Sequence, residues 1–209
     1  TGTNLQALLD AARDPSYPAR IVLVVSNRPD AGGLERAARA GVPTRVIPSR
    51  AFADREAYDA ALDEALREAE VELVCLAGFM RVLGRDIVER WRDRMLNIHP
   101  SLLPAFRGLE THARVLEAGL PVTGCTVHFV RPEIDEGPVI VQGVVPVLPG
   151  DTVESLNARV LEVEHRCYPR ALALVAGGRT KVIDERVATA QERPFERLIL
   201  HPDLSEACR

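Results

Sequence analysis

The strongest constraint on this chain comes from two runs of apolar residues with little alternation between apolar and polar side chains, residues 20–26 and 71–77. A strand with one face in water alternates apolar and polar side chains, so a continuous run indicates a strand that is buried on both faces. Strands of that kind lie in parallel sheets that helices cover on both sides. The two runs therefore predict an α/β fold built on a buried sheet.

Helical and strand patterns alternate along the rest of the chain. Helices are predicted over residues 5–12, 33–40, 54–70, 84–92, 111–118 and 152–176, and strands over residues 20–26, 44–47, 71–77, 94–98, 122–130, 138–147 and 179–183. Asn4 is expected to cap the first helix. This order predicts a Rossmann-like, mostly parallel central sheet with helices on both faces. The first strand of such a sheet is missing from the chain, and we expect it upstream of Thr1.

The charge balance limits the partners of the chain. It carries 26 Lys and Arg against 30 Asp and Glu, a net charge of −4, whereas a nucleic-acid backbone requires a basic face. We therefore expect no nucleic-acid partner, although a local pocket can still hold a small anion. No apolar run approaches the roughly 20 residues of a membrane span, and none is expected. The four cysteines are scattered, which predicts no metal site, reduced thiols and a cytoplasmic location.

Two polar residues, Asn97 and His99, stand at the end of a predicted strand. Ligands of open α/β sheets bind outside the carboxyl ends of the strands, and residues two apart in a strand point to the same side. An amide beside an imidazole can hold a developing oxyanion and move a proton, as acyl transfer requires. In the alternative reading, His99 only caps the strand end and bonds to the proline-rich loop that follows.

Asp135 lies in an acidic turn between two later strands. Such a turn is often simply solvated, but a carboxylate there can also orient a histidine and stabilise its charge. Spacing alone does not bring Asp135 to His99. His128 lies on a strand and is expected to be a packed, hydrogen-bonded residue.

Residues 1–4 precede the first predicted helix. The free N–H groups and the dipole of a helix start favour an anion, so Gly2, Thr3 and Asn4 are candidates for a phosphate site. Capping of the helix explains Asn4 equally well.

Five separated segments together resemble one enzyme family. They are residues 1–6, 77–83, 97–104, 124–130 and 135–140. In this order they are similar to the phosphoribosylglycinamide formyltransferases, the glycinamide ribonucleotide transformylases of purine synthesis, and the match extends to about residue 182. The resemblance implies one formyltransferase domain over residues 1–183, with a nucleotide-binding half (1–96) and a catalytic and folate-binding half (97–183). Residues 184–209 are then a polar tail.

The family resemblance also implies a reaction and its participants. A formyl group passes from 10-formyltetrahydrofolate to the amine of 5′-phosphoribosylglycinamide, giving formyl-phosphoribosylglycinamide and tetrahydrofolate. Both partners are small molecules, and neither a metal nor nucleic acid is implied. The chain is expected to be a monomer or a homodimer.

The resemblance assigns roles to particular residues. Asn97 would bind the formyl oxygen, His99 would be the general acid, and Asp135 would favour protonated His99. The ribonucleotide would be held by Gly2, Thr3, Asn4 and Glu164. The folate would contact Arg55, Met80, Arg81, Val82, Leu83 and Asn97.

This chain departs from the family pattern beside the site. Arg107 and Glu110 stand where the family more often has Pro and His, and Glu136 replaces a frequent Gly.

Three other interpretations of the function stay open. Formyltetrahydrofolate deformylase shares the folate half and the catalytic trio but uses water as the nucleophile. Methionyl-tRNA formyltransferase would need an RNA-binding domain, and a noncatalytic nucleotide-binding module would make Asn97 and His99 structural.

Overall fold

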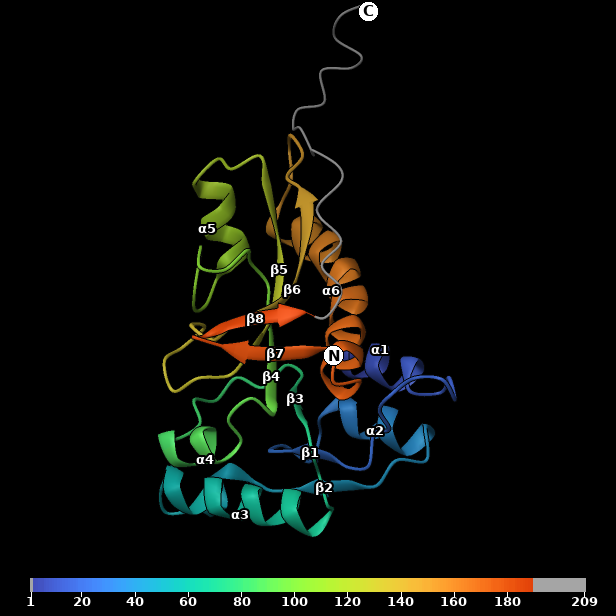
Figure 1. Ribbon diagram of the computed structural model, residues 1–209. Coiled ribbons are helices and arrows are strands. Elements are labelled where there is room, and N and C mark those ends of the chain that lie inside the picture. Colours follow the sequence, from blue (N-terminus) through green and yellow to red (C-terminus); the bar gives the residue numbers. More distant parts are fainter. Residues whose placement is uncertain (1, 190–209) are drawn as a thin grey trace, which may run out of the picture.

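The structure of this chain, a computed structural model, describes residues 2–189. Its centre is a four-stranded sheet in the order β3-β4-β5-β6, with strands β3 (Val74–Leu76), β4 (Met95–His99), β5 (Val122–Phe129) and β6 (Val139–Pro146). Helices pack around the sheet, as Figure 1 shows, so the predicted α/β class is confirmed.

The strands of the central sheet run in mixed directions. β3 and β4 are parallel, whereas β4 pairs antiparallel with β5, and β5 antiparallel with β6. The short loop between β5 and β6 accounts for their antiparallel pairing, because a parallel pair needs a crossover of a dozen or more residues. Parallel pairing is therefore confined to the first half of the chain, and the sheet is mixed rather than mostly parallel.

Two further strands, β1 (Val24–Ser26) and β2 (Thr44–Val46), form a separate parallel pair. A cavity of about 1280 Å³ lies between β1 and β3, lined by residues of both strands. The described residues contain no strand before the first helix, and neither strand is paired on the edge that faces this cavity. The paired segments are shorter than the predicted runs 20–26 and 71–77, because strand residues without a neighbour make no ladder bonds.

All six predicted helices are present, with ends shifted by a few residues. They are α1 (Thr3–Ala11), α2 (Gly32–Arg39), α3 (Arg55–Glu68), α4 (Arg85–Arg90), α5 (Thr111–Glu117) and α6 (Val153–Ala176), with a short 3₁₀ turn, η1 (Ser49–Ala51). One detail was wrong: α1 is capped by Gly2, in the left-handed conformation (φ 69°), and not by Asn4. The Asn4 side chain is instead bonded to a distant residue, Glu164.

The long helix α6 forms the main core with the central sheet. Its apolar stripe, which includes Leu156, Val160 and Ala171, is buried against β5 and β6. The buried Tyr168 places its hydroxyl 2.9 Å from the carbonyl oxygen of Leu76 and 3.1 Å from that of Leu96. This contact fixes α6 beneath the ends of β3 and β4, next to the strand end that carries the candidate residues.

The C-terminal part of the described chain corrects the expectation of a polar tail from residue 184. β7 (Thr180–Ile183) turns directly into β8 (Arg186–Thr189), and the two pair antiparallel. Asp184 and Glu185 form the two-residue turn with positive φ angles of 48° and 54°. Such turns are usually marked by Asn-Gly or Asp-Gly, so the sequence gives little sign of this hairpin. The rest of the expected tail, residues 190–209, lies outside the described residues.

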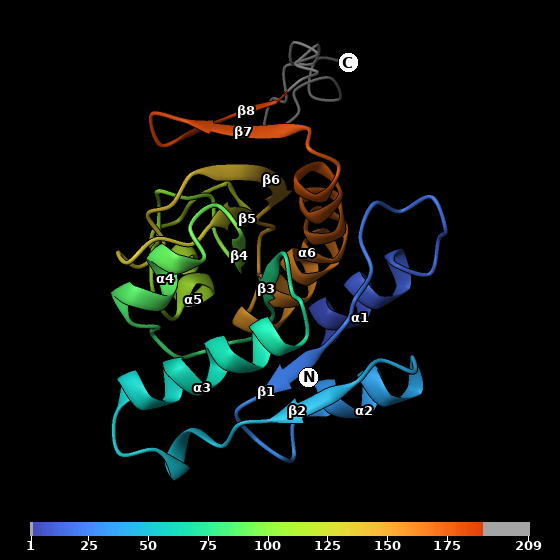
Figure 2. The same ribbon diagram turned by 60° about the horizontal axis from the view of Figure 1, so that its bottom comes forward.

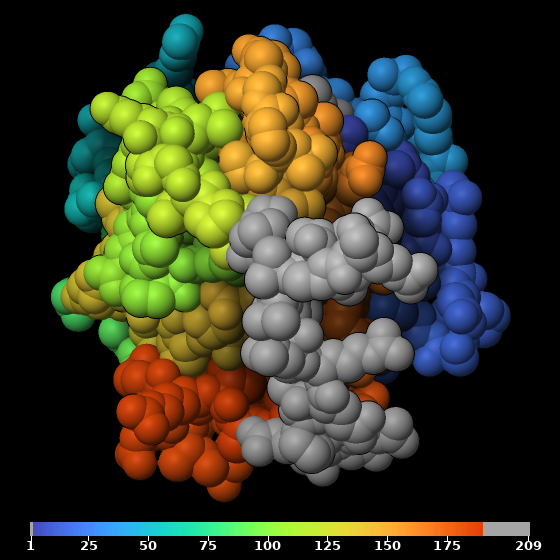
Figure 3. All heavy atoms as spheres, turned by 90° about the horizontal axis from the view of Figure 1, so that it is seen from above, coloured from blue at the N-terminus to red at the C-terminus, as the bar shows by residue number. Residues whose placement is uncertain are grey.

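The hairpin packs against the second half of the sheet. β8 contacts β6, and Figure 3 shows the red hairpin at the surface beside the olive-coloured chain around β6. Figure 2 shows the opposite end of the molecule, where α3 lies between the β1–β2 pair and α4.

A buried carboxylate, Asp63, joins α3 to α4. It is 2% exposed and accepts hydrogen bonds from the Trp91 indole (2.9 Å), Arg90 (2.5 Å) and Arg67 (3.1 Å). Burial alone would raise the pKa of Asp63, but the bonds from Trp91 and Arg90 outweigh it and lower that pKa. The ionised carboxylate therefore stabilises the contact between the two helices.

We expect Asp63→Asn to lower the free energy of unfolding by roughly 1–3 kcal/mol at neutral pH, because the bonds to the charged group weaken. A depressed pKa means that this stabilisation is present above the ordinary carboxyl range and is lost as pH falls through the folded-state value. The difference between the Asp63→Asn variant and the wild type in urea titrations should thus shrink on acidification. A difference that stays constant down to about pH 3 would contradict the ionic role.

Candidate active site

The candidate site forms at the carboxyl end of β4. Because β3 is its parallel neighbour, with Leu76 opposite Asn97, the loop that follows β3 leaves the sheet at the edge where β4 ends at His99. The antiparallel β5 places His128 opposite Asn97. Sheet register thus assembles the site from segments that are distant in sequence.

His99 is 5% exposed and has an acceptor at each ring nitrogen. Its Nε2 lies 2.9 Å from the carbonyl oxygen of Phe106, and its Nδ1 lies 3.3 Å from Oδ2 of Asp135. Since a carbonyl oxygen only accepts, Nε2 donates its proton there. When both ring nitrogens carry a proton, each has an acceptor: the Phe106 carbonyl at Nε2 and the Asp135 carboxylate at Nδ1.

Asp135 reaches this position from a tight loop between β5 and β6. Its backbone is left-handed (φ 56°), which is uncommon for a residue other than glycine. The carboxylate is 9% exposed; Oδ2 accepts the Gly108 N–H at 2.9 Å, and Oδ1 lies 3.7 Å from Nε2 of His128. The expected approach of Asp135 to His99 is confirmed, and the alternative of a solvated turn residue is wrong.

His128 holds the amide of Asn97. Its Nδ1 donates to the carbonyl oxygen of Phe129 (2.9 Å), which leaves Nε2 to accept from Nδ2 of Asn97 (3.3 Å). Burial lowers the pKa of His128, with the nearby Asp135 acting in the opposite direction. A neutral imidazole therefore fixes the orientation of the Asn97 amide, consistent with the packed, hydrogen-bonded residue that the sequence predicted.

The loop after His99 supplies two backbone groups that the sequence did not reveal, the Phe106 carbonyl and the Gly108 N–H. The buried hydroxyl of Thr126 folds this loop, since it accepts from the Leu103 N–H (3.0 Å) and donates to the Ser101 carbonyl (2.7 Å). Gly108 has a positive φ (79°), which its residue type suggests, but Phe106 is also left-handed (φ 54°) without any such sign.

A second polar group lies where α1 meets α6. Nδ2 of Asn4 donates to Oε2 of Glu164 at 2.7 Å, and Glu164 is 7% exposed. Burial raises the pKa of Glu164, although the Asn4 bond works to lower it. Glycine suits position 2, because the backbone there is left-handed and a Cβ would lie a tight 3.0 Å from the Gly33 backbone. The first turn of α1, which starts at Thr3, has no side-chain cap.

The residues expected to contact folate lie on the loop after β3 and at the start of α3. Met80 and Val82 are exposed (78% and 53%), whereas Leu83 is buried in the core. Arg81 lies over the Tyr58 ring, 5.1 Å from its centroid. Burial raises the pKa of Asp59, whose carboxylate accepts the Gly84 N–H. The positive charges of Arg55 and Arg81 act to lower the same pKa. Two guanidinium groups thus lie near Asp59, and one of them belongs to the loop that exposes Met80 and Val82.

Two of the residues that depart from the family pattern contact each other. Arg107 forms an ion pair with Glu136 at 2.5 Å, and both side chains are about half-exposed. The pair lies beside the Asp135 loop and the loop that carries Phe106 and Gly108. Glu110 precedes α5 with a left-handed backbone (φ 55°) and forms no side-chain cap.

A sequence model of the formyl transferase family matches residues 1–172 of the chain. The chain belongs to this family. Within the part that the structure describes, no helix has the length and apolar character needed to cross a membrane. Residues 2–189 also hold no group of three or more His, Cys, Asp or Glu side chains that could bind a metal ion.

The comparisons with individual proteins point to one branch of the formyl transferases. The chain is 53% identical to a trifunctional purine biosynthetic protein adenosine-3 from Bos taurus, over 87% of this chain but 18% of that protein. It is also 53% identical to glycinamide ribonucleotide transformylase 1 from Symbiobacterium toebii, with a TM-score of 0.88 and coverage of 90% of this chain and 89% of the other. A formyltetrahydrofolate deformylase from Pseudomonas syringae is 26% identical, with a TM-score of 0.84 over 90% of this chain and 62% of the other.

We expect His128 to be neutral at neutral pH, with its proton on Nδ1, because burial disfavours the charged ring. Nitrogen-15 NMR of labelled histidines measures this tautomer directly. Since the folded-state pKa is lowered, protonation of His128 at acid pH should favour the unfolded chain. The Asn97→Ala variant serves as the control, because it removes the donor to Nε2 but leaves the Phe129 carbonyl in place. A proton on Nε2 in the wild type would contradict this arrangement.

Proposed function

We propose that this chain transfers a formyl group from 10-formyltetrahydrofolate to the amine of 5′-phosphoribosylglycinamide, yielding formyl-phosphoribosylglycinamide and tetrahydrofolate. Purine synthesis would use this product. The observation that carries the proposal is the series of contacts that runs from Asn97 through His128 and Asp135 to His99 at the end of β4, in a chain of the formyl transferase family.

Each member of the trio has a distinct task in this proposal. Asn97 has one N–H bonded to His128, and its other N–H is available to the formyl oxygen as negative charge develops there. His99 is the general acid. Asp135 stabilises the positive charge of that ring and helps proton movement. Because Nδ1 faces Asp135, the proton leaves from Nε2, where the substrate replaces the Phe106 carbonyl.

The residues around the loop after β3 fit a folate donor. The bound donor would supply the formyl group, which is at the oxidation level of a carboxylic acid. Met80 and Val82 offer apolar surface next to the strand end, and Arg55 and Arg81 offer positive charge for a glutamate carboxylate. Leu83 is buried, so its side chain would shape the loop, leaving contact with the folate to its backbone.

The Gly2–Thr3–Asn4 segment and Glu164 would hold the acceptor. The uncapped N–H groups at the start of α1 suit a phosphate, and the buried Glu164 carboxylate suits the glycinamide end. Oδ1 of Asn4 is buried without a hydrogen-bond partner, which leaves one acceptor atom for a ligand. The same proposal includes small-molecule partners only, no metal, action in the cytoplasm, and a monomer or homodimer.

Dependence on the acceptor separates transfer from the alternative, hydrolysis by a deformylase. We expect release of the deformylated folate, followed by absorbance with a formyl-folate analogue, only when phosphoribosylglycinamide is present. Glu164→Gln should raise the KM for the ribonucleotide roughly 10-fold with little effect on the KM for the folate, because it removes a buried charge at the acceptor end. Equal turnover with and without the ribonucleotide would select the deformylase, and no turnover at all would favour a binding module.

Substitutions in the trio should lower kcat more than they change KM. His99→Ala removes the proton donor and Asn97→Ala removes an oxyanion donor, so each should reduce kcat by roughly 10²-fold or more. Asp135→Asn keeps the size of the side chain but loses its charge. The protonated ring of His99 would then lack its charged partner, so kcat should fall and the pH–rate profile should change. An Asp135→Asn profile with the shape and height of the wild type would assign Asp135 no part in the reaction.

A further inference from the structure

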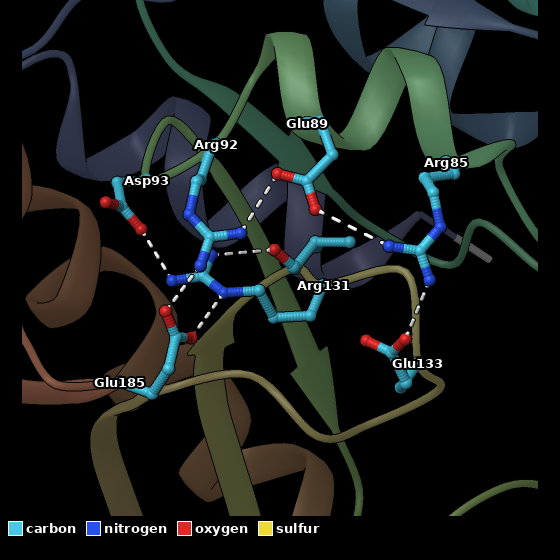
Figure 4. Close-up of polar contacts among 8 residues, drawn as sticks. Arg85, Glu89, Arg92, Asp93, Arg131, Glu133 and Glu185 are labelled. Atoms are coloured by element: carbon cyan, nitrogen blue, oxygen red, sulfur yellow. Dashed lines mark hydrogen bonds and ion pairs between the residues drawn. The ribbon is translucent and has the colours of Figure 1, made fainter.

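Arg131 is a buried cation with no task in the proposed reaction. It follows β5 directly, and its side chain is 6% exposed. Nε donates to Glu185 at 2.6 Å, Nη2 to Asp93 at 2.7 Å, and Nη1 to the carbonyl of Val130 at 3.0 Å. Figure 4 shows the guanidinium between the two acids, with Arg92 also bonded to Glu185.

The two acids that bind Arg131 come from tight turns on different parts of the chain. Asp93 lies between α4 and β4 with a φ of 57°, and Glu185 lies in the β7–β8 turn with a φ of 54°. The hydrogen bond from Arg131 is the main cause of a lowered pKa of Glu185. Arg131 therefore ties the C-terminal hairpin to the segment that leads into β4.

The stem of Arg131 also fixes the loop that carries Asp135. A Cβ on Gly137 would lie 3.3 Å from Cγ of Arg131 and 1.7 Å from the Phe129 carbonyl oxygen, so residue 137 is pressed against both. Glu133, halfway along the loop, is held by Arg85 of α4 at 3.0 Å, as Figure 4 also shows. The loop is thus held at Arg131 and Glu133, before Asp135, and at Gly137, after it.

The hairpin and the Asp135 loop also share a cavity. Its volume is about 380 Å³, and its lining includes Asp135, Gly137, Glu185 and Val187. A left-handed conformation at a residue such as Asp135 persists only where the surroundings impose it. The bonds of Arg131 are one buried part of those surroundings.

We propose that Arg131 is a positioning residue that holds the Asp135 carboxylate against His99, and that it does so by anchoring the loop to Glu185 of the β7–β8 hairpin and to Asp93. The effect on rate rests on the proposed function. The effect on the loop is independent of the proposed function. The Gly108 N–H donates to the Asp135 carboxylate, so exchange of the Gly108 amide measures the position of that carboxylate whatever reaction the site performs.

Arg131→Gln tests this proposal, with Arg159→Gln as the matched control. Arg159 also binds an acid twice, Asp151 at 2.7 and 3.0 Å, and a carbonyl, but it lies on α6. The carboxylates left behind by Arg131→Gln are about half-exposed, so water can solvate them and the variant should fold. Glu185→Gln is a second variant that removes one anchor and leaves the arginine in place.

For Arg131→Gln we expect faster hydrogen exchange of the Gly108 amide, roughly 10-fold, and a similar fall in kcat with little change in KM. Its pH–rate profile should change in the same way as that of Asp135→Asn. Glu185→Gln should show the same changes with smaller size, and Arg131→Lys should restore part of the activity. Arg159→Gln should leave all of these quantities unchanged.

Unchanged Gly108 exchange and an unchanged pH–rate profile in Arg131→Gln would overturn the proposal. Equal losses in Arg159→Gln would overturn it as well, since they would show a general effect of losing an arginine that binds an acid and a carbonyl. If the wild type does not transfer formyl groups to phosphoribosylglycinamide, the proposed function fails. The Gly108 exchange rates of Arg131→Gln, Glu185→Gln and Arg159→Gln would still decide whether Arg131 positions Asp135.

Discussion

The pairing of β4 with two different neighbours is the constraint on which the rest of the site depends. Its parallel edge, shared with β3, brings the loop with Met80 and Arg81 to the strand end, and its antiparallel edge, shared with β5, brings His128 beside Asn97. A slip of one residue in either ladder would turn Asn97 and His99 to the other face. The hydroxyl of Tyr168, within reach of carbonyls on both β3 and β4, supports this arrangement from below.

Much of this arrangement could be predicted from the sequence, because it follows from local patterns. Continuous apolar runs located β1 and β3, although their residues are only half-buried, and helical spacing located all six helices. The position of Asn97 and His99 just at a strand end identified the candidate site. The motifs around Asp135 added a third member, although only the fold shows that its carboxylate lies 3.3 Å from His99.

What the sequence did not reveal depends on backbone conformation or on long-range contacts. Phe106 adopts a left-handed conformation that its residue type disfavours, and Asp135 adopts one that aspartate tolerates but does not require, so no local preference indicates either. Asparagine is a residue type that commonly caps helices, yet the amide of Asn4 binds Glu164, 160 positions away. The β7–β8 turn uses Asp-Glu in place of a glycine-containing pair, and the anchor at Arg131 becomes visible only when that hairpin is in place.

The ion pair between Arg107 and Glu136 has a consequence for the charge around the candidate site. The two side chains neutralise each other across the two loops that meet at His99 and Asp135. Replacement of one partner by a neutral residue would leave the other charge unmatched beside the Asp135 carboxylate or the His99 imidazole. Positions 107 and 136 therefore act as one unit, in which a change of charge at one leaves the local field unaltered only if the other changes with it.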